Sequence, residues 1–135
     1  GFKMSETNMT KRILKAIDRD VVDIIGHPTG RMINKRRGYK VDMQKIFEKA
    51  KENDIFLEIN SSPKRLDLDH HNVRGAVKKG VKIVINTDAH NTQHLDMIEL
   101  GVAQARRGWA TKDDIINTRS YSELKSYFKK LKSKS

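Results

Sequence analysis

The sequence contains no cysteine among its 135 residues. It therefore has no disulfide, thiolate metal site or cysteine nucleophile, and any metal ion must be bound through nitrogen and oxygen atoms. This composition suits a reducing compartment, so we expect a cytoplasmic protein. No apolar run approaches the about 18 to 20 residues that cross a bilayer. Residues 1–5 also lack the apolar centre of a secretory signal, and we expect no membrane partner.

Positive charge dominates the composition. The chain has 28 Lys and Arg residues against 17 Asp and Glu residues, a formal net charge of +11 and an isoelectric point near 10.0. This balance favours contact with a polyanion such as nucleic acid, although a solvated basic surface has the same composition. The length and a hydrophobic content of 36% fit one globular domain.

Helical and strand patterns alternate along the sequence. Apolar spacing and capping residues predict helices over 10–17, 42–50, 69–80 and 92–106, and short apolar runs predict strands over 21–25, 55–59 and 81–85. Residues 108–110 are a candidate for a short fourth strand. Alternation of this length predicts an α/β fold, with three to four parallel strands joined by crossover helices, as in a sheet or a piece of a barrel.

The last fifteen residues predict a basic amphipathic helix over 121–135. Apolar side chains mark one face, and lysines occupy most of the remainder.

Two histidine-bearing turns follow predicted buried strands. Gly26-His27-Pro28 follows the first strand, and Thr87-Asp88-Ala89-His90 follows the third. A parallel sheet presents its functional groups at the carboxyl ends of its strands, so His27, Asp88 and His90 could converge on one metal ion or cluster. We interpret this pattern as metal-dependent hydrolysis with Asp88 and His90 at the catalytic centre. The alternative for His27 is a loop histidine that satisfies local hydrogen bonds.

Glu58 lies inside an otherwise apolar strand, where a charge needs a cation, a metal or several donors. One interpretation is that Glu58 and Asn60 support the metal ligands from behind; the other is an ion pair of Glu58 with Arg31 or Arg65. These two arginines follow the first and second turns, and cations beside a metal site suit a phosphate substrate. The alternative is a solvated basic loop.

The remaining histidines and the single tryptophan carry weaker signals. We expect His70, His71 and His94 to face solvent, because they lie in polar helical segments. We expect Trp109 to pack at the bottom of the fold, with stacking on a nucleic-acid base as the alternative.

Five strings carry a resemblance to a known family: Gly26-His27-Pro28-Thr29-Gly30-Arg31, Glu58-Ile59-Asn60, Arg65-Leu66-Asp67-Leu68, Thr87-Asp88-Ala89-His90 and Ala105-Arg106-Arg107-Gly108-Trp109. Together and in this order they resemble the PHP (polymerase and histidinol phosphatase) domain. They are most similar to the version fused to bacterial and archaeal family X DNA polymerases.

The resemblance implies a distorted βα barrel with a trinuclear centre of divalent metal ions, which would be zinc, manganese or iron. It makes His27, Asp88 and His90 three of the ligands. The family's opening His-x-His motif, its other ligands and the polymerase part are absent from the sequence. We therefore expect residues 1–135 to be the C-terminal segment of one PHP domain, as a fragment or a truncated gene product. Such a segment would be inactive alone and partnered by the remainder of that domain, the polymerase domains and DNA.

The resemblance further implies removal of nucleotides from a DNA 3′ end during repair synthesis. Two alternatives stay open. One is a histidinol-phosphatase-like phosphoesterase that acts on a small molecule. The other is a non-catalytic basic module that binds DNA through the lysine-rich terminal helix.

Overall fold

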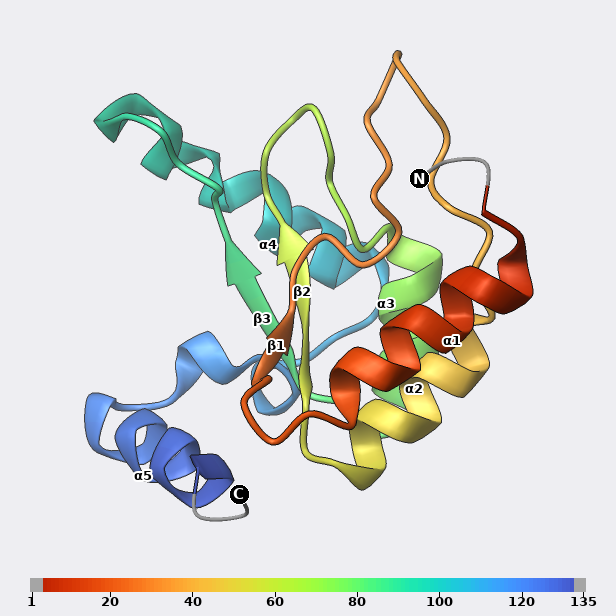
Figure 1. Ribbon diagram of the computed structural model, residues 1–135. Coiled ribbons are helices and arrows are strands. Elements are labelled where there is room, and N and C mark those ends of the chain that lie inside the picture. The colour runs from red at the N-terminus through yellow and green to blue at the C-terminus, as the bar shows by residue number, and fades with distance from the viewer. Residues whose placement is uncertain (1–3, 133–135) are drawn as a thin grey trace.

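A computed structural model describes residues 4–132, and their side chains up to residue 128. Three parallel strands form one sheet in the order β1 (Ile24–Ile25), β2 (Phe56–Asn60) and β3 (Ile83–Asn86) (Figure 1). The α-helices are α1 (Glu6–Ile17), α2 (Met43–Glu52), α3 (His70–Lys78), α4 (Ile98–Arg107) and α5 (Tyr121–Lys132). The predicted α/β fold is therefore confirmed, whereas its closure as part of a PHP barrel stays a prediction. None of the helices within residues 4–132 has the length and apolar character needed to span a membrane.

Helices α2 and α3 begin within one residue of their predicted starts, whereas α1 begins at Glu6, four residues before the predicted start. Ser5, Asp42 and Asp69 each accept a hydrogen bond from the backbone N–H three residues further on, at α1, α2 and α3 respectively. These caps satisfy N–H groups that have no partner inside a helix. After α3, Gly80 takes a φ of +78°, a left-handed conformation in which glycine has no Cβ penalty.

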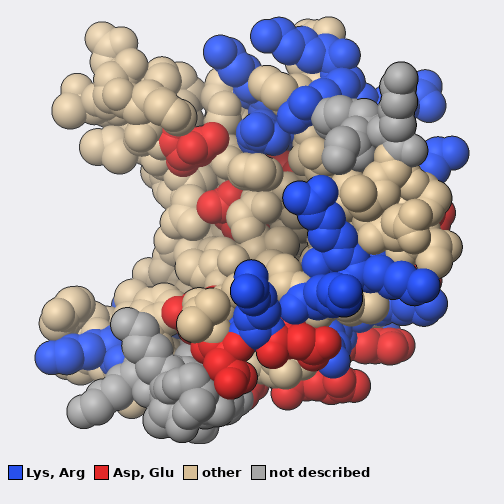
Figure 2. Space-filling view, in the orientation of Figure 1, with Lys and Arg blue, Asp and Glu red and all other residues tan. Residues whose placement is uncertain are grey.

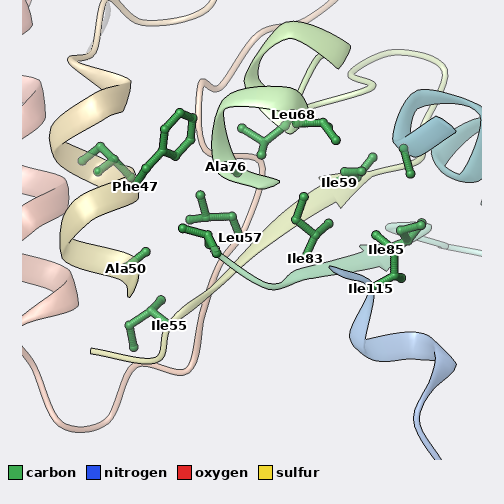
Figure 3. Close-up of a cluster of buried hydrophobic side chains, with 14 of the residues drawn as sticks. Phe47, Ala50, Ile55, Leu57, Ile59, Leu68, Ala76, Ile83, Ile85 and Ile115 are labelled. Carbon is green, nitrogen blue, oxygen red and sulfur yellow. The ribbon is translucent and has the colours of Figure 1, made fainter. Parts of the chain in front are cut away.

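The main core lies between one face of the sheet and helices α1–α4 (Figure 3). Leu57 and Ile59 of β2 and Ile83 and Ile85 of β3 point to this face, because alternate residues of a strand share a side. Phe47 of α2 packs with them and is 1% exposed. Each such side chain contributes about 1.5–3 kcal/mol by leaving water, so this face supplies most of the stability.

The opposite face of the sheet is apolar only near the amino end of β2. Phe56 of β2 packs edge-on against Tyr127 and Phe128 of α5, at ring-centroid distances of 5.2 and 6.0 Å. Val84 of β3 joins the same cluster. The apolar side of α5 therefore packs on this face of the sheet. Residues 133–135 of the predicted helix, and the side chains of 129–132, lie outside the described residues.

The predicted fourth strand at 108–110 is wrong. These residues form the turn that ends α4, where the N–H groups of Gly108 and Ala110 donate to the α4 carbonyls of Gln104 and Ala105. The outer edge of β3 is occupied instead by Asn117, whose side chain exchanges two hydrogen bonds of 2.8 Å with the backbone of Ile85.

Three further expectations need correction. The first strand is limited to Ile24–Ile25, and Val21 is 82% exposed. The helix predicted over 92–106 is a 3-10 helix, Thr92–Met97, followed by α4. Trp109 does not pack beneath the fold, since 69% of its surface is exposed.

Gly101 is the contact point of α4 with the sheet. A Cβ at this position would overlap Ser61 Oγ and lie 2.5 Å from Ile85 Cγ2. Because both neighbours are buried, we expect Gly101→Ala to lower the free energy of unfolding by about 1–2 kcal/mol, overpacking outweighing the gain in helix propensity. Urea unfolding measures this change.

Two variants control that experiment. Val102→Ala, at the neighbouring and partly exposed position, should stay within about 0.5 kcal/mol of the parent. Adding Ser61→Ala to Gly101→Ala removes the oxygen that the new methyl meets and should restore part of the loss. A rise in stability on Gly101→Ala alone would refute this account of how α4 is placed.

Candidate functional site

The two histidine-bearing turns lie at the same edge of the sheet. β1 and β3 both run parallel to β2, so their carboxyl ends point the same way. His27 stands two residues beyond β1, and Asp88 and His90 stand two and four residues beyond β3. All three side chains are exposed. Topology therefore brings the predicted ligands to one edge, as the strand order requires.

Two of these residues have unusual backbone conformations. His27 has a φ of +28° and Asp88 a φ of +55°. Non-glycine residues adopt positive φ values uncommonly and at a cost, and they cluster at functional sites where the surroundings hold them. Glu58 and Asn60 of β2 form hydrogen bonds with His27 and Asp88 respectively, and these bonds hold the two residues in place.

Glu58 connects the two turns from the central strand. Its Oε1 accepts a hydrogen bond of 2.9 Å from His27 N–H, and its Oε2 accepts one of 2.9 Å from the Asn86 side-chain amide. Among the described residues, Glu58 forms no ion pair with Arg31 or Arg65. The geometry favours the interpretation in which Glu58 supports the ligand-bearing turns by hydrogen bonds.

Asn60, at the end of β2, also forms hydrogen bonds with neighbouring loops. Its side chain is 1% exposed, and its Nδ2 lies 3.4 Å from Asp88 Oδ2 while its Oδ1 accepts from Ser62 N–H at 3.0 Å. Asn60 therefore orients the Asp88 carboxylate and the loop after β2 together.

Asp67 was missed by the sequence reasoning. This fully buried carboxylate accepts hydrogen bonds from the backbone N–H groups of Thr29, at 3.0 Å, and Gly30, at 2.8 Å. Burial raises the pKa of Asp67 above its ordinary value, although these hydrogen bonds and the Arg31 charge oppose the shift. The sequence feature that points to this role is the position of Asp67 between Leu66 and Leu68. A carboxylate buried among apolar residues is tolerated only when hydrogen-bond donors or a cation pair with it.

Arg31 holds the same loop from the other side. Its Nε donates to the Arg65 carbonyl at 2.7 Å, and its Nη2 donates to the Leu66 carbonyl. These bonds fix the loop after β2 against the His27 turn. Arg31 is thus engaged with backbone, and its predicted substrate role would need its remaining donors.

A cavity of about 380 Å³ opens between the loop after β2 and the loop after β3. Lys64 and Arg65 line it on one side, and Asp88, His90 and His94 line it on the other. Arg65 Nη1 is buried with no hydrogen-bond partner among the described residues. A buried guanidinium nitrogen without an acceptor is costly. Because this atom is shielded from solvent, the positive charge of the cavity wall comes from Lys64 and the remainder of the Arg65 side chain.

The His90 ring is oriented by its own loop. Its Nδ1 lies 2.7 Å from the Asp88 carbonyl oxygen, which can only accept, so Nδ1 carries the proton. In the neutral ring this bond leaves the lone pair on Nε2, the nitrogen that would then be available to a metal ion.

His94 also belongs to this cavity, contrary to the expectation that it faces solvent. Its Nδ1 accepts from His90 N–H at 3.2 Å, and its side chain is half-buried. No helical spacing predicts this contact, because His90 precedes the 3-10 helix Thr92–Met97 and bonds to His94 through its backbone. Of the other two histidines, His71 is exposed as expected and His70 is half-buried.

The donors within the described residues do not make a closed metal site. Across residues 4–132, no group of three or more His, Asp or Glu side chains lies close enough to hold one ion. Structural and catalytic metal sites use three or four protein ligands. His27, Asp88 and His90 therefore do not fit a complete centre by themselves.

Comparison with known proteins identifies the family. No family model matches the chain. The DNA polymerase/3′-5′ exonuclease PolX of Bacillus subtilis is 40% identical over 130 residues, which is 96% of this chain and 23% of PolX. A probable phosphatase of a Thermoanaerobacter species is 34% identical over 131 residues, covering 93% of the chain and 51% of the phosphatase. The resemblance to the PHP family is confirmed.

The similarity extends to more distant proteins. A probable phosphatase of Aliivibrio fischeri is 26% identical over 121 residues. This PHP chain spans less than a quarter of PolX and about half of the Thermoanaerobacter phosphatase.

Removing the Asp67 carboxylate should loosen the His27 turn. In Asp67→Ala the N–H groups of Thr29 and Gly30 lose their acceptor, which costs about 1–3 kcal/mol for each buried donor left unpaired. We expect amide hydrogen exchange at these two residues to accelerate. Asp69→Ala, which removes the cap of α3 instead, is the control; equal protection at residues 29 and 30 in Asp67→Ala and the parent would contradict the assignment.

The raised pKa of Asp67 predicts a pH dependence of stability. Because the folded state binds this proton more tightly than the unfolded chain, Asp67 contributes most below the unfolded pKa of 3.8. Its contribution falls as the pH rises through the folded value. The free energy of unfolding of the parent minus that of Asp67→Asn should therefore decrease from about pH 3 upward and then level off. A flat difference would count against the burial of this carboxyl group.

Proposed function

We propose that the chain is the C-terminal segment of a PHP phosphoesterase domain and forms part of a distorted βα barrel. In this proposal it works within a longer cytoplasmic protein that hydrolyses phosphoesters with divalent metal ions. One observation supports the proposal most: the turn bearing His27 and the turn bearing Asp88 and His90 follow parallel strands at the same edge of the sheet, and Glu58 between them bonds to His27 N–H and to the Asn86 side chain at the end of β3. Imidazole and carboxylate donors at such an edge suit zinc, manganese or iron.

The remaining ligands would come from outside these 135 residues. The chain spans only 23% of PolX, and its own donors form no closed site within residues 4–132. We therefore propose that the segment is inactive until the rest of the domain is present.

The proposed substrate is the 3′ end of DNA. Lys64 and Arg65 line the cavity whose wall also includes Asp88 and His90, and their positive charge supports a phosphodiester as the ligand. The net charge of +11 and the 40% identity to a 3′-5′ exonuclease support nucleic acid. The phosphatase relatives support a small phosphate monoester as the second candidate.

A chimera tests the proposal. The matching segment of Bacillus subtilis PolX is replaced by this chain, and nucleotide removal from a 3′-recessed oligonucleotide is measured with Mn²⁺. We expect His27→Ala, Asp88→Ala and His90→Ala each to reduce the rate at least about 100-fold, because each removes a metal ligand. His71→Ala, an exposed histidine outside the cavity, is the matched control.

Three further results are expected. EDTA should abolish cleavage, the 135-residue chain alone should show background activity, and histidinol phosphate should be hydrolysed far more slowly than the oligonucleotide. Full activity of the chain alone, or an unaffected His27→Ala chimera, would overturn the proposal; faster hydrolysis of histidinol phosphate would favour the second candidate.

A further inference from the structure

Trp109 is held in an exposed position at the end of α4. It is the only tryptophan of the chain, and 69% of its surface is accessible to solvent. Its φ is +63°, and its N–H donates to the Arg106 carbonyl at 2.9 Å. This is the helix-ending position that glycine or asparagine usually fills. A bulky residue rarely adopts this left-handed conformation because its Cβ makes the conformation unfavourable. The presence of tryptophan there suggests that its side chain has a role.

One ring face of Trp109 is already covered by a cation. The Arg74 guanidinium carbon lies 3.9 Å from the ring centroid, a cation–π contact from α3 that fixes the orientation of the indole. The large exposed fraction leaves the opposite ring face open to solvent. An indole fixed on one face and open on the other is a preorganised stacking platform.

The surroundings of this platform are positively charged. Arg106 and Arg107 precede Trp109 and are exposed, and no carboxylate in residues 4–132 forms an ion pair with either of them or with Arg74. Figure 2 shows that Lys and Arg gather over the upper and right-hand parts of one face, whereas most Asp and Glu lie along its lower edge. On the face shown, the basic side chains are therefore concentrated in its upper and right-hand parts.

A second basic surface lies on the other flank of α3. The loop of residues 31–37 borders a hollow of about 610 Å³, together with the capping residue Asp69 and with Asn72 of α3. Arg31, Lys35, Arg36 and Arg37 line this hollow. Because α3 also supplies Arg74, one helix joins the basic hollow to the Trp109 platform.

We propose that Trp109 stacks on a base of a single-stranded nucleic acid, with Arg74 behind the indole and the neighbouring arginines on the adjacent phosphates. The combination matches the known physical requirements of such sites, which pair an aromatic face with a basic groove. The site requires no metal ion, so it stands apart from the proposed phosphoester chemistry and can fail or succeed independently of it.

Tryptophan emission reports on this site directly, because Trp109 is the only source. The 135-residue chain is titrated with oligothymidylate in EDTA, and with oligouridylate to separate DNA from RNA. Inorganic polyphosphate of equal charge serves as the base-free control. We expect quenching of emission by at least one oligonucleotide and little by polyphosphate.

Substitution at the platform supplies the second measurement. Trp109→Gly relieves the left-handed conformation, so its unfolding midpoint should be unchanged or higher. Because this variant has no tryptophan, binding is measured by the fluorescence anisotropy of a dye-labelled oligonucleotide, and the Kd should rise about tenfold. Trp109→Phe should retain most of the affinity. Tyr121→Ala, which removes another exposed aromatic ring, should bind like the parent.

Several outcomes would overturn the proposal. They are an unchanged Kd in Trp109→Gly, equal quenching by polyphosphate, or the absence of any emission change on binding. A blue shift that depends on protein concentration would show that Trp109 is buried by protein rather than by a base.

Discussion

The backbone N–H groups of the turn after β1 need acceptors, and two carboxylates supply them. His27 N–H donates to Glu58, and the N–H groups of Thr29 and Gly30 donate to Asp67. The Gly30 N–H is buried and the Thr29 N–H is partly buried, and buried backbone donors are almost always paired, so the bonds to Asp67 restrict where the turn can lie. The acceptors lie on β2 and on the loop that follows it. The position of His27 relative to Asp88 therefore depends on the central strand rather than on the turns themselves.

The central strand changes character along its length. Phe56, Glu58 and Asn60 share one face because alternate strand residues point the same way. Phe56 packs against α5, whereas Glu58 and Asn60 bond to the flanking turns. One strand face thus contributes packing at its start and polar contacts at its end. A carboxylate at the position of Phe56, two residues earlier on the same face, would lose these donors. It would lie among the apolar side chains that pack against α5, where burial of an unpaired charge is costly.

The local parts of this structure could be predicted and the long-range pairs could not. Caps such as Asp42 and Asp69 act within three residues, and the strand-end position of His27 follows from a short apolar run and Pro28. Asp67 meets Gly30 across 37 residues of sequence, and no periodicity encodes that contact. The burial predicted for Trp109 is wrong for a related reason. Hydrophobicity predicts burial on average, but the exposure of a given ring depends on whether a neighbouring element covers it.

Backbone strain connects the two inferred sites. His27, Asp88 and Trp109 all have positive φ values without being glycine. Glycine at any of these positions would adopt the same conformation without the steric penalty that a Cβ imposes. Stability alone would therefore favour glycine at each position. Asn34, Asp54 and Leu66 also have positive φ values, so this conformation alone does not mark a ligand site. What sets His27, Asp88 and Trp109 apart is that their side chains, an imidazole, a carboxylate and an indole, are exposed at the proposed sites and can bind a ligand that glycine cannot.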